Sequence, residues 1–128
     1  EFCGTQHARM GLRVIAVSPE RFADWLYEQA KDAMVTEGEG YEAFVSGGCH
    51  GCHAIRGTDA QGALGPDLTH VASRRTLGAG TVANDRDGLR RWLEGHGSDL
   101  KPGNRGAGYV PADEKLAETI AGYLEQLE

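Results

Sequence analysis

Five consecutive residues, Cys49-His50-Gly51-Cys52-His53, place the strongest constraint on what this chain can fold around. The pattern C-x-x-C-H is the attachment signature of c-type haem. Its spacing has a physical reason, because two thiols must reach two vinyl groups on one edge of a porphyrin. The next residue must then present an imidazole to the iron. We therefore expect covalent haem c on Cys49 and Cys52, with His53 as the proximal iron ligand.

Besides haem attachment, the motif is compatible with a chance match, a redox dithiol or half of a zinc site. A chance C-x-x-C-H is rare in a chain of 128 residues. A zinc site needs a second C-x-x-C or a nearby histidine pair, and a thioredoxin-like dithiol needs a βαβ context. The flanks offer neither, so a zinc-binding or structural module without haem has the least support from the sequence.

Composition favours a single small domain with many loops. The chain has 19 glycines and 40% hydrophobic residues, and a large cofactor would add volume to a lean core. Its formal net charge is −6 and no basic patch is visible, which argues against nucleic acid as a partner. No apolar run is long enough to cross a bilayer. The first residues carry no secretory signal and no initiator methionine, which is typical of a fragment or a processed product.

Local signals predict one strand and four helices. The β-branched run over residues 12–17 favours a strand, and Ser18-Pro19-Glu20 is typical of a helix start. A second helix is expected around Tyr41–Val45, ended by Gly47 and Gly48. The others are expected over 85–93, with Asn84 as cap, and over 113–127, where an apolar stripe indicates core packing.

The flanks of the haem motif resemble the cytochrome c domain that is fused to subunit II of caa-type cytochrome c oxidases. The matching runs are "GCHGCHAIRGTDAQGALGPDLTHVASRRTLGAGTVAN" and "LRRWLEGHGSDLKPGN". Near the N-terminus, "EFCGTQHARM" resembles the later half of the dinuclear copper (CuA) signature of the same subunit. The run "VSPERFADWL" resembles the strand and helix that close that copper domain. Two motifs of one subunit thus occur in the right order.

The resemblance implies an all-α fold, a class I cytochrome c-like domain, preceded by a short strand-plus-helix remnant of a cupredoxin-like CuA domain. The expected boundaries are 1–31 for the remnant, 32–38 for a linker and 39–128 for the cytochrome c domain. In that domain the Tyr41–Val45 helix and the Leu116–Leu127 helix would cross near the haem.

The resemblance also implies electron transfer from a cytochrome or bc-complex donor towards the CuA centre. The partners would be the other subunits of a haem-copper oxidase. The chain would be no enzyme by itself, since oxygen reduction belongs to another subunit. Because haem is attached to thiols outside the bacterial cytoplasm, the domain is expected in the periplasm or on the outer membrane face. The parent subunit would be anchored in that membrane.

Copper is implied only for the complete parent subunit. Four residues match the later half of the family's ligand set: Glu1, Cys3, His7 and Met10. The first cysteine and the upstream histidine of that set would precede this chain. Since a dinuclear thiolate-bridged centre needs both sulfurs, these four residues are expected to bind copper in the parent protein only.

On the distal side of the haem, the family's methionine would align near Gly106, and none stands there. Only Met10 and Met34 occur in the chain. An open sixth position would make the domain able to bind a diatomic gas, which is the alternative function. Other candidates are a ligand from a partner chain, Lys101, Met34 and, ranked first among internal donors, His96.

Several further residues are expected around the haem. Pro66 would supply the carbonyl that orients His53, or pack beside it. His70 would either hydrogen-bond near the haem edge or be satisfied by the backbone. Arg74 and Arg75 suit the two propionates, and Trp92 is expected to pack against the haem or the core.

Overall fold

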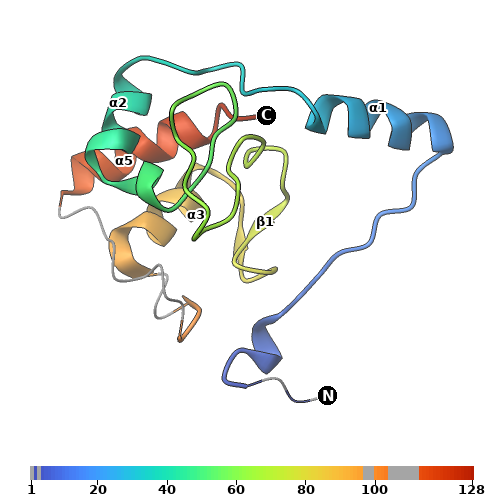
Figure 1. The fold of residues 1–128 in the computed structure, drawn as a ribbon. Helices are drawn as coiled ribbons and strands as arrows, with labels where there is room; N and C mark the ends of the chain where they lie inside the picture. Colours follow the sequence, from blue (N-terminus) through green and yellow to red (C-terminus); the bar gives the residue numbers. More distant parts are fainter. Residues whose placement is uncertain (1, 3, 97–99, 104–112) are drawn as a thin grey trace.

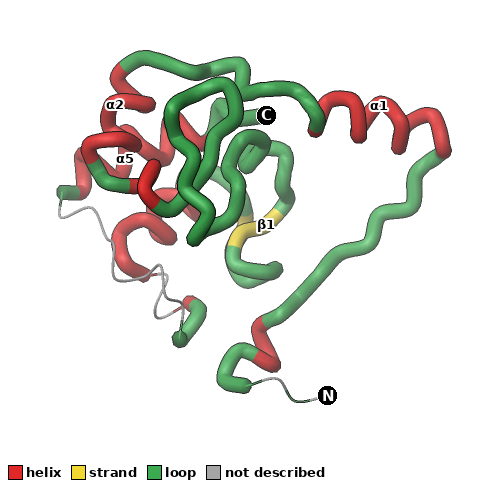
Figure 2. The backbone as a smooth tube through the Cα atoms, in the orientation of Figure 1, coloured by secondary structure: helices red, strands yellow, loops and turns green. Residues whose placement is uncertain are grey.

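The computed structural model describes residues 2, 4–96, 100–103 and 113–128. Three helices, α2 (Glu39–Ser46), α3 (Arg86–Arg91) and α5 (Glu114–Leu124), gather into one body, and α1 (Pro19–Gln29) lies beside it (Figure 1). The remaining elements are short: η1 (His7–Arg9), η2 (Cys49–Gly51), η3 (Trp92–His96) and the strands β1 (Thr76–Leu77) and β2 (Val82–Ala83). Loops connect them over long stretches (Figure 2). This mostly helical architecture agrees with the expected all-α class.

Helices α2 and α5, the pair expected to cross, pack against each other at the centre of the body. Gly40 permits the close approach, because a β-carbon at this position would lie 2.6 Å from Cβ of Tyr123. The Tyr123 ring lies 6.0 Å from the rings of both Tyr41 and Phe44. Phe44 and Tyr123 are almost fully buried, so these aromatic contacts form the centre of the core.

The last helix buries one face, as its sequence predicts, and it begins at a side-chain cap, Asp113, that was expected inside its first turn. The carboxylate of Asp113 accepts a hydrogen bond from the backbone N–H of Lys115 at 2.9 Å. The buried face of α5 holds Ala117, Ile120, Ala121, Tyr123 and Leu124. Leu127 follows the helix and is fully buried too, so the chain stays on the core to its last residues.

The cap of α3 differs from the prediction. Asp85, and not Asn84, accepts the hydrogen bond from the N–H of Gly88, at 2.8 Å. Asn84 is engaged elsewhere, because its side-chain amide donates to the carbonyls of Val71 and Arg74, both at 2.7 Å. It therefore closes the preceding loop instead of starting the helix.

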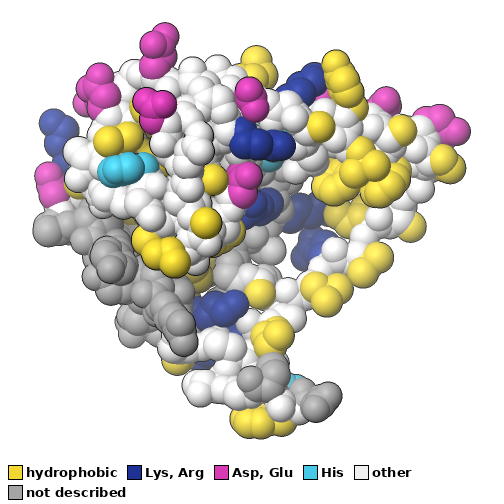
Figure 3. Space-filling model, viewed as in Figure 1, with side chains coloured by type: hydrophobic (Ala, Val, Ile, Leu, Met, Phe, Trp, Pro, Cys, Tyr) yellow, Lys and Arg dark blue, Asp and Glu magenta, His cyan; other side chains and the backbone are white. Residues whose placement is uncertain are grey.

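The N-terminal segment forms its helix as expected but no strand pairing among the described residues. Pro19 is the first residue of α1, and the Ser18 hydroxyl accepts from the N–H of Arg21 at 3.4 Å. Residues 11–18 are extended without a strand partner in the described part of the chain. No residue of α1 is buried, and its apolar side chains form an exposed patch (Figure 3).

The stretch 32–38 is not helical, yet it is fastened to the core. Ala33 is buried, and its N–H donates to the carbonyl of Arg56 at 3.0 Å. The Tyr123 hydroxyl donates to the carbonyl of Val35 at 3.1 Å. Burial, with a smaller contribution from Tyr41, raises the pKa of Tyr123 to about 12, so this donor keeps its proton at physiological pH.

The hairpin of β1 and β2 was not predicted. Its turn contains three consecutive residues with positive φ, Gly78 at 58°, Ala79 at 59° and Gly80 at 83°. Gly78 is required for a second reason, because a β-carbon there would lie 2.6 Å from the Trp92 indole.

Among the elements that the structure describes, no helix is long and apolar enough to cross a membrane.

We expect Gly40→Ala to lower the free energy of unfolding by about 1–3 kcal/mol, because its methyl group would overpack the contact with Tyr123. Urea unfolding followed by circular dichroism measures this change. The matched control is Gly122→Ala in α5, where the atoms nearest to the added methyl group would be those of the flexible Arg86 guanidinium. It should change stability by less than about 1 kcal/mol. Equal unfolding midpoints for the two variants would contradict the close helix contact.

Candidate functional site

The two thiols of the C-x-x-C-H motif lie on one tight turn directly after α2. Gly48, with φ of 76°, reverses the chain and begins η2. The N–H groups of Cys52 and His53 both donate to the carbonyl of Cys49, at 3.1 and 3.0 Å. Both cysteines are half-buried and carry free thiols.

The protonation of Cys49 argues against a redox dithiol. Burial, with a smaller contribution from the neighbouring Cys52, raises the pKa of the Cys49 thiol. Reactive cysteines in C-x-x-C oxidoreductases have a lowered thiol pKa, because the thiolate is the attacking species. The environment of Cys49 thus favours a neutral thiol that packs on the core.

The His53 ring is held by one hydrogen bond to the main chain. Its Nδ1 lies 2.8 Å from the carbonyl oxygen of Pro66. Because a carbonyl can only accept, Nδ1 carries the proton and Nε2 carries the lone pair. Within the described part of the chain, no hydrogen bond engages Nε2. An imidazole with its Nδ1–H tied to a carbonyl is the usual form of a metal-ligating histidine. The donor set of two thiols and one oriented imidazole therefore fits haem c.

Two glycines bring the following loop close to the motif. A β-carbon at Gly65 would lie 2.4 Å from the His53 ring, and one at Gly62 would lie 2.4 Å from the main chain of Cys52. The N–H of Gly65 also donates to the carbonyl of Cys52 at 2.7 Å. At position 65 only glycine leaves room for the His53 ring, so the loop packs closely against the imidazole.

A short polar network fixes the turn that presents the Pro66 carbonyl. The N–H of Arg56 donates to the Thr69 hydroxyl at 2.9 Å. That hydroxyl donates to a carboxylate oxygen of Asp67 at 2.5 Å, and the Thr69 N–H donates to the same oxygen at 2.8 Å. This network was not predicted from the sequence; the signal for it was the Asp-x-Thr spacing, which is typical of an Asx-turn.

The charge of Asp67 is stabilised by the same contacts. Burial by itself would raise the pKa of the Asp67 carboxyl. The hydrogen bonds from Thr69 and the charges of Arg56 and Arg74 outweigh it, so the pKa lies below its ordinary value of 3.8. The carboxylate form therefore strengthens the turn.

The expected haem-environment residues lie at different places around this loop. The Arg74 guanidinium donates to the carbonyl of Asp67 at 2.5 Å, and Arg75 is exposed beside it. Trp92 is half-buried against the turn of the hairpin at Gly78. Both ring nitrogens of His70 lie within hydrogen-bond distance of main-chain oxygens, Nδ1 at 2.7 Å from Glu128 and Nε2 at 3.0 Å from Lys31.

The expected distal candidates fall mostly outside the described residues. The position near Gly106 lies in 104–112, and the side chain of His96 is likewise not described. The Lys101 ammonium group donates a hydrogen bond to the carbonyl of Gly78 at 3.0 Å. Met34 is 90% exposed.

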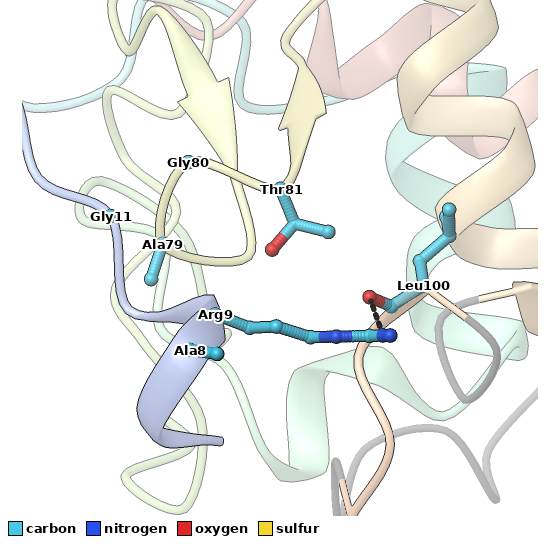
Figure 4. Close-up of a pocket in the computed structure, with 7 residues that line it drawn as sticks. All are labelled: Ala8, Arg9, Gly11, Ala79, Gly80, Thr81 and Leu100. Atoms are coloured by element: carbon cyan, nitrogen blue, oxygen red, sulfur yellow. Dashed lines mark hydrogen bonds between the residues drawn. The ribbon is translucent and has the colours of Figure 1, made fainter.

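Of the four copper-ligand candidates, Glu1 and Cys3 lie outside the described residues. His7 lies in η1, and Met10 follows it directly. Within the described ranges, no three His, Cys, Asp or Glu residues are grouped so that they could hold a metal ion. The Arg9 guanidinium donates to the carbonyl of Leu100 at 2.8 Å, across a pocket walled by residues 79–81 (Figure 4). The segment also contacts the hairpin, because a β-carbon at Gly11 would lie 3.1 Å from the carbonyl oxygen of Ala79.

Comparison with known proteins places the motif in a recognised domain. Residues 38–128 match the cytochrome c family. Cytochrome c oxidase subunit 2 of Alkalihalophilus pseudofirmus is 31% identical over 134 residues, which is 100% of this chain and 37% of that protein. The subunit of the same name from Bacillus subtilis is 29% identical over 135 residues, which is 100% of this chain and 38% of that protein. The chain spans less than two-fifths of the length of these relatives. The predicted resemblance and the predicted fold class are confirmed.

We expect Gly65→Val to displace the His53 ring and weaken iron ligation in the haem-loaded protein. The control is Gly51→Ala in the attachment turn, because a β-carbon there would meet no atom within 4 Å. The optical spectrum and the midpoint potential of each variant measure the effect. Gly51→Ala should match the unmodified protein, whereas Gly65→Val should show an altered Soret band. A normal spectrum for Gly65→Val would contradict the packing of Gly65 on the ring.

The lowered pKa of Asp67 predicts an acid-sensitive contribution to stability. A carboxyl whose pKa is lower in the folded than in the unfolded state stabilises the fold above the unfolded value, and this contribution disappears as pH falls through the folded value. Asp67→Asn should therefore be less stable than the unmodified protein at pH 7. The difference should shrink as pH falls below about 4. Urea midpoints at several pH values test this, and a pH-independent difference would contradict it.

Proposed function

Because the chain belongs to the cytochrome c family, we propose that Cys49 and Cys52 hold one haem c through thioether bonds and that His53 ligates its iron. The observation that carries the proposal is the hydrogen bond from His53 Nδ1 to the Pro66 carbonyl, which leaves Nε2 available as an iron ligand. In each attachment the sulfur adds to a vinyl group, and the thiol proton goes to the other vinyl carbon. When bound, the haem supplies an iron that gains and loses one electron.

The protein's own residues suit electron transfer through this group. The Pro66 carbonyl holds the Nδ1 proton and makes the imidazole a stronger electron donor to iron. The loop that holds the ring is restrained by hydrogen bonds from the N–H groups of Gly62 and Gly65 to the haem motif and by the Thr69 network. A ligand that moves little when the charge on the metal changes keeps the reorganisation accompanying electron transfer small.

The setting we propose is subunit 2 of a haem-copper oxidase. Both relatives carry the name cytochrome c oxidase subunit 2 and align with the whole chain. We assign residues 1–31 to the end of the copper domain, 32–38 to the connection and 39–128 to the cytochrome domain. Electrons would pass from a cytochrome or bc-complex donor through the haem towards the CuA centre of the complete subunit. Glu1, Cys3, His7 and Met10 would belong to that centre.

The exposed apolar face of α1 supports the assignment of the N-terminal part. Phe22, Trp25 and Leu26 are 48–51% exposed, and the rings of Phe22 and Trp25 stack with their centroids 5.7 Å apart. Hydrophobic side chains gather over α1 on the face shown in Figure 3. Such a patch is costly in water and is typical of a surface that another part of the protein covers. We propose that the rest of the copper domain covers it in the complete subunit, on the outer face of the membrane.

The gas-binding alternative has weaker support. It depends on the missing methionine near Gly106, whereas the relatives are named for an oxidase subunit. Carbon monoxide added to the ferrous protein distinguishes an open from a closed sixth position.

Haem attachment is the decisive test of the proposal. We expect the chain, produced in a bacterium that matures c-type cytochromes, to carry one haem that acid–acetone extraction does not remove. The double variant Cys49→Ala and Cys52→Ala should lose it, since no thiol then remains in the motif. His50→Ala is the control, because His50 is exposed within the same turn. Intact-protein mass spectrometry measures all three.

A bare polypeptide mass for the unmodified chain would refute the proposal. If haem is present, reduction by ascorbate and reoxidation by the CuA domain of a complete subunit 2 test the direction of electron flow. A haem that stays reduced in the presence of oxidised CuA would contradict the proposed route.

A further inference from the structure

We infer that Arg56, His70 and Ser73 form a docking face for the carbonyl end of α1. In this docking face His70 is protonated on both ring nitrogens. The docking face holds the copper-domain remnant in one orientation against the haem domain. The functional meaning of this inference rests on the proposed function. The contacts themselves do not depend on it.

The end of α1 presents acceptors that the helix itself cannot satisfy. The last carbonyls of any helix lack intrahelical donors and carry the negative end of the helix dipole. The last turn of α1 contains no basic residue. Donors therefore have to come from elsewhere in the chain, and cationic donors suit this position best.

One side chain of the haem domain donates to a carbonyl of α1, and two others contact the last residue of the helix or the chain just after it. The Arg56 guanidinium donates to the carbonyl of Gln29 at 2.6 Å. The side-chain amide of Gln29 donates to the hydroxyl of Ser73 at 3.4 Å. Nε2 of His70 lies 3.0 Å from the carbonyl oxygen of Lys31. All three side chains belong to segments that follow the haem motif in the chain, well after α1 ends.

The second nitrogen of His70 determines its protonation. Nδ1 lies 2.7 Å from the main-chain oxygen of Glu128. Both neighbours of the ring are acceptors, and a neutral imidazole has only one N–H to donate. His70 is only 7% exposed, so water cannot easily replace a missing donor. A neutral ring would direct a lone pair at one of the two oxygens, whereas the imidazolium donates to both.

Charged residues of both signs lie on the elements around His70. On α1 and just after it, Glu28 and Lys31 pair with each other at 2.6 Å. The loop that carries His70 also carries Asp67 and Arg74, and Glu128 comes from the C-terminus. Figure 1 shows this C-terminus beside the segment that joins α1 to α2.

These contacts fix the direction of α1, since none of the residues of this helix is buried. The preceding segment touches the haem domain again. Arg9 donates to the Leu100 carbonyl, and at the hairpin a β-carbon at Gly80 would lie 3.3 Å from the Cα of Gly11. Two separate attachments restrain rotation as well as translation. The orientation of α1 relative to the haem domain is then set by the fold.

The direct test is the state of the His70 ring in the ferrous, haem-loaded protein at pH 7, with carbon monoxide added if the sixth position is open. Long-range ¹⁵N–¹H correlation spectra separate the imidazolium from both neutral tautomers. We expect protons on both nitrogens of His70. A lone pair on either nitrogen would overturn the inference. This measurement needs no variant, so it stands even if substitutions at residue 70 prevent folding.

Amide hydrogen exchange tests the docking itself. His70→Gln should speed exchange at Ala30, Lys31 and Ala33 by roughly tenfold or more, as expected for losing a hydrogen bond from a charged donor. His50→Gln is the matched control, because His50 is exposed and lies in the attachment turn. Unchanged exchange in a folded His70→Gln variant would overturn the docking face. Haem content, measured on the same samples by mass spectrometry, reports separately on the proposed function.

Discussion

The hydrogen bond between His53 and the Pro66 carbonyl is the interaction on which the rest of the site depends. It decides which nitrogen carries the proton and which way the other one points. To deliver that carbonyl, the chain must return over 13 residues and approach the ring from one side. The glycines at 62 and 65 and the turn organised by Asp67 and Thr69 are the consequences of that single requirement.

The core follows from a second constraint, the close packing of α2 on α5. Cys49 follows α2 after a two-glycine turn, so whatever fixes α2 also fixes the attachment thiols. The fixing comes from Tyr123, which contacts two rings of α2 and reaches Val35 with its hydroxyl. One residue of the last helix thereby links the haem motif to the segment that leads in from the N-terminus.

The sequence predicted those features whose causes lie within a few neighbouring residues. The haem motif, the Ser18-Pro19 start of α1 and the apolar stripe of α5 each depend on local spacing. The predicted cap of α3 is one residue too early, since Asn84 and Asp85 are equivalent as local signals. They differ only because Val71 and Arg74, which lie more than nine residues away along the chain, provide acceptors for Asn84. The hairpin turn escaped prediction for a similar reason, because the packing of Trp92 on Gly78 has no local signature.

Residue 70 shows most clearly where reasoning from local sequence ends. A histidine that faces a haem edge and one that joins two distant backbones look alike in the run "PDLTH". The difference lies in residues 31 and 128, which are separated by most of the chain and meet only after α5 has packed. The apolar face of α1 and its carbonyl end thus have different roles. The cytochrome domain leaves the face uncovered, whereas it already holds the end. A helix fixed at its end and uncovered along its side is suited to join two domains. One domain can cover the apolar side of the helix, while the other domain holds its carbonyl end and so fixes its direction.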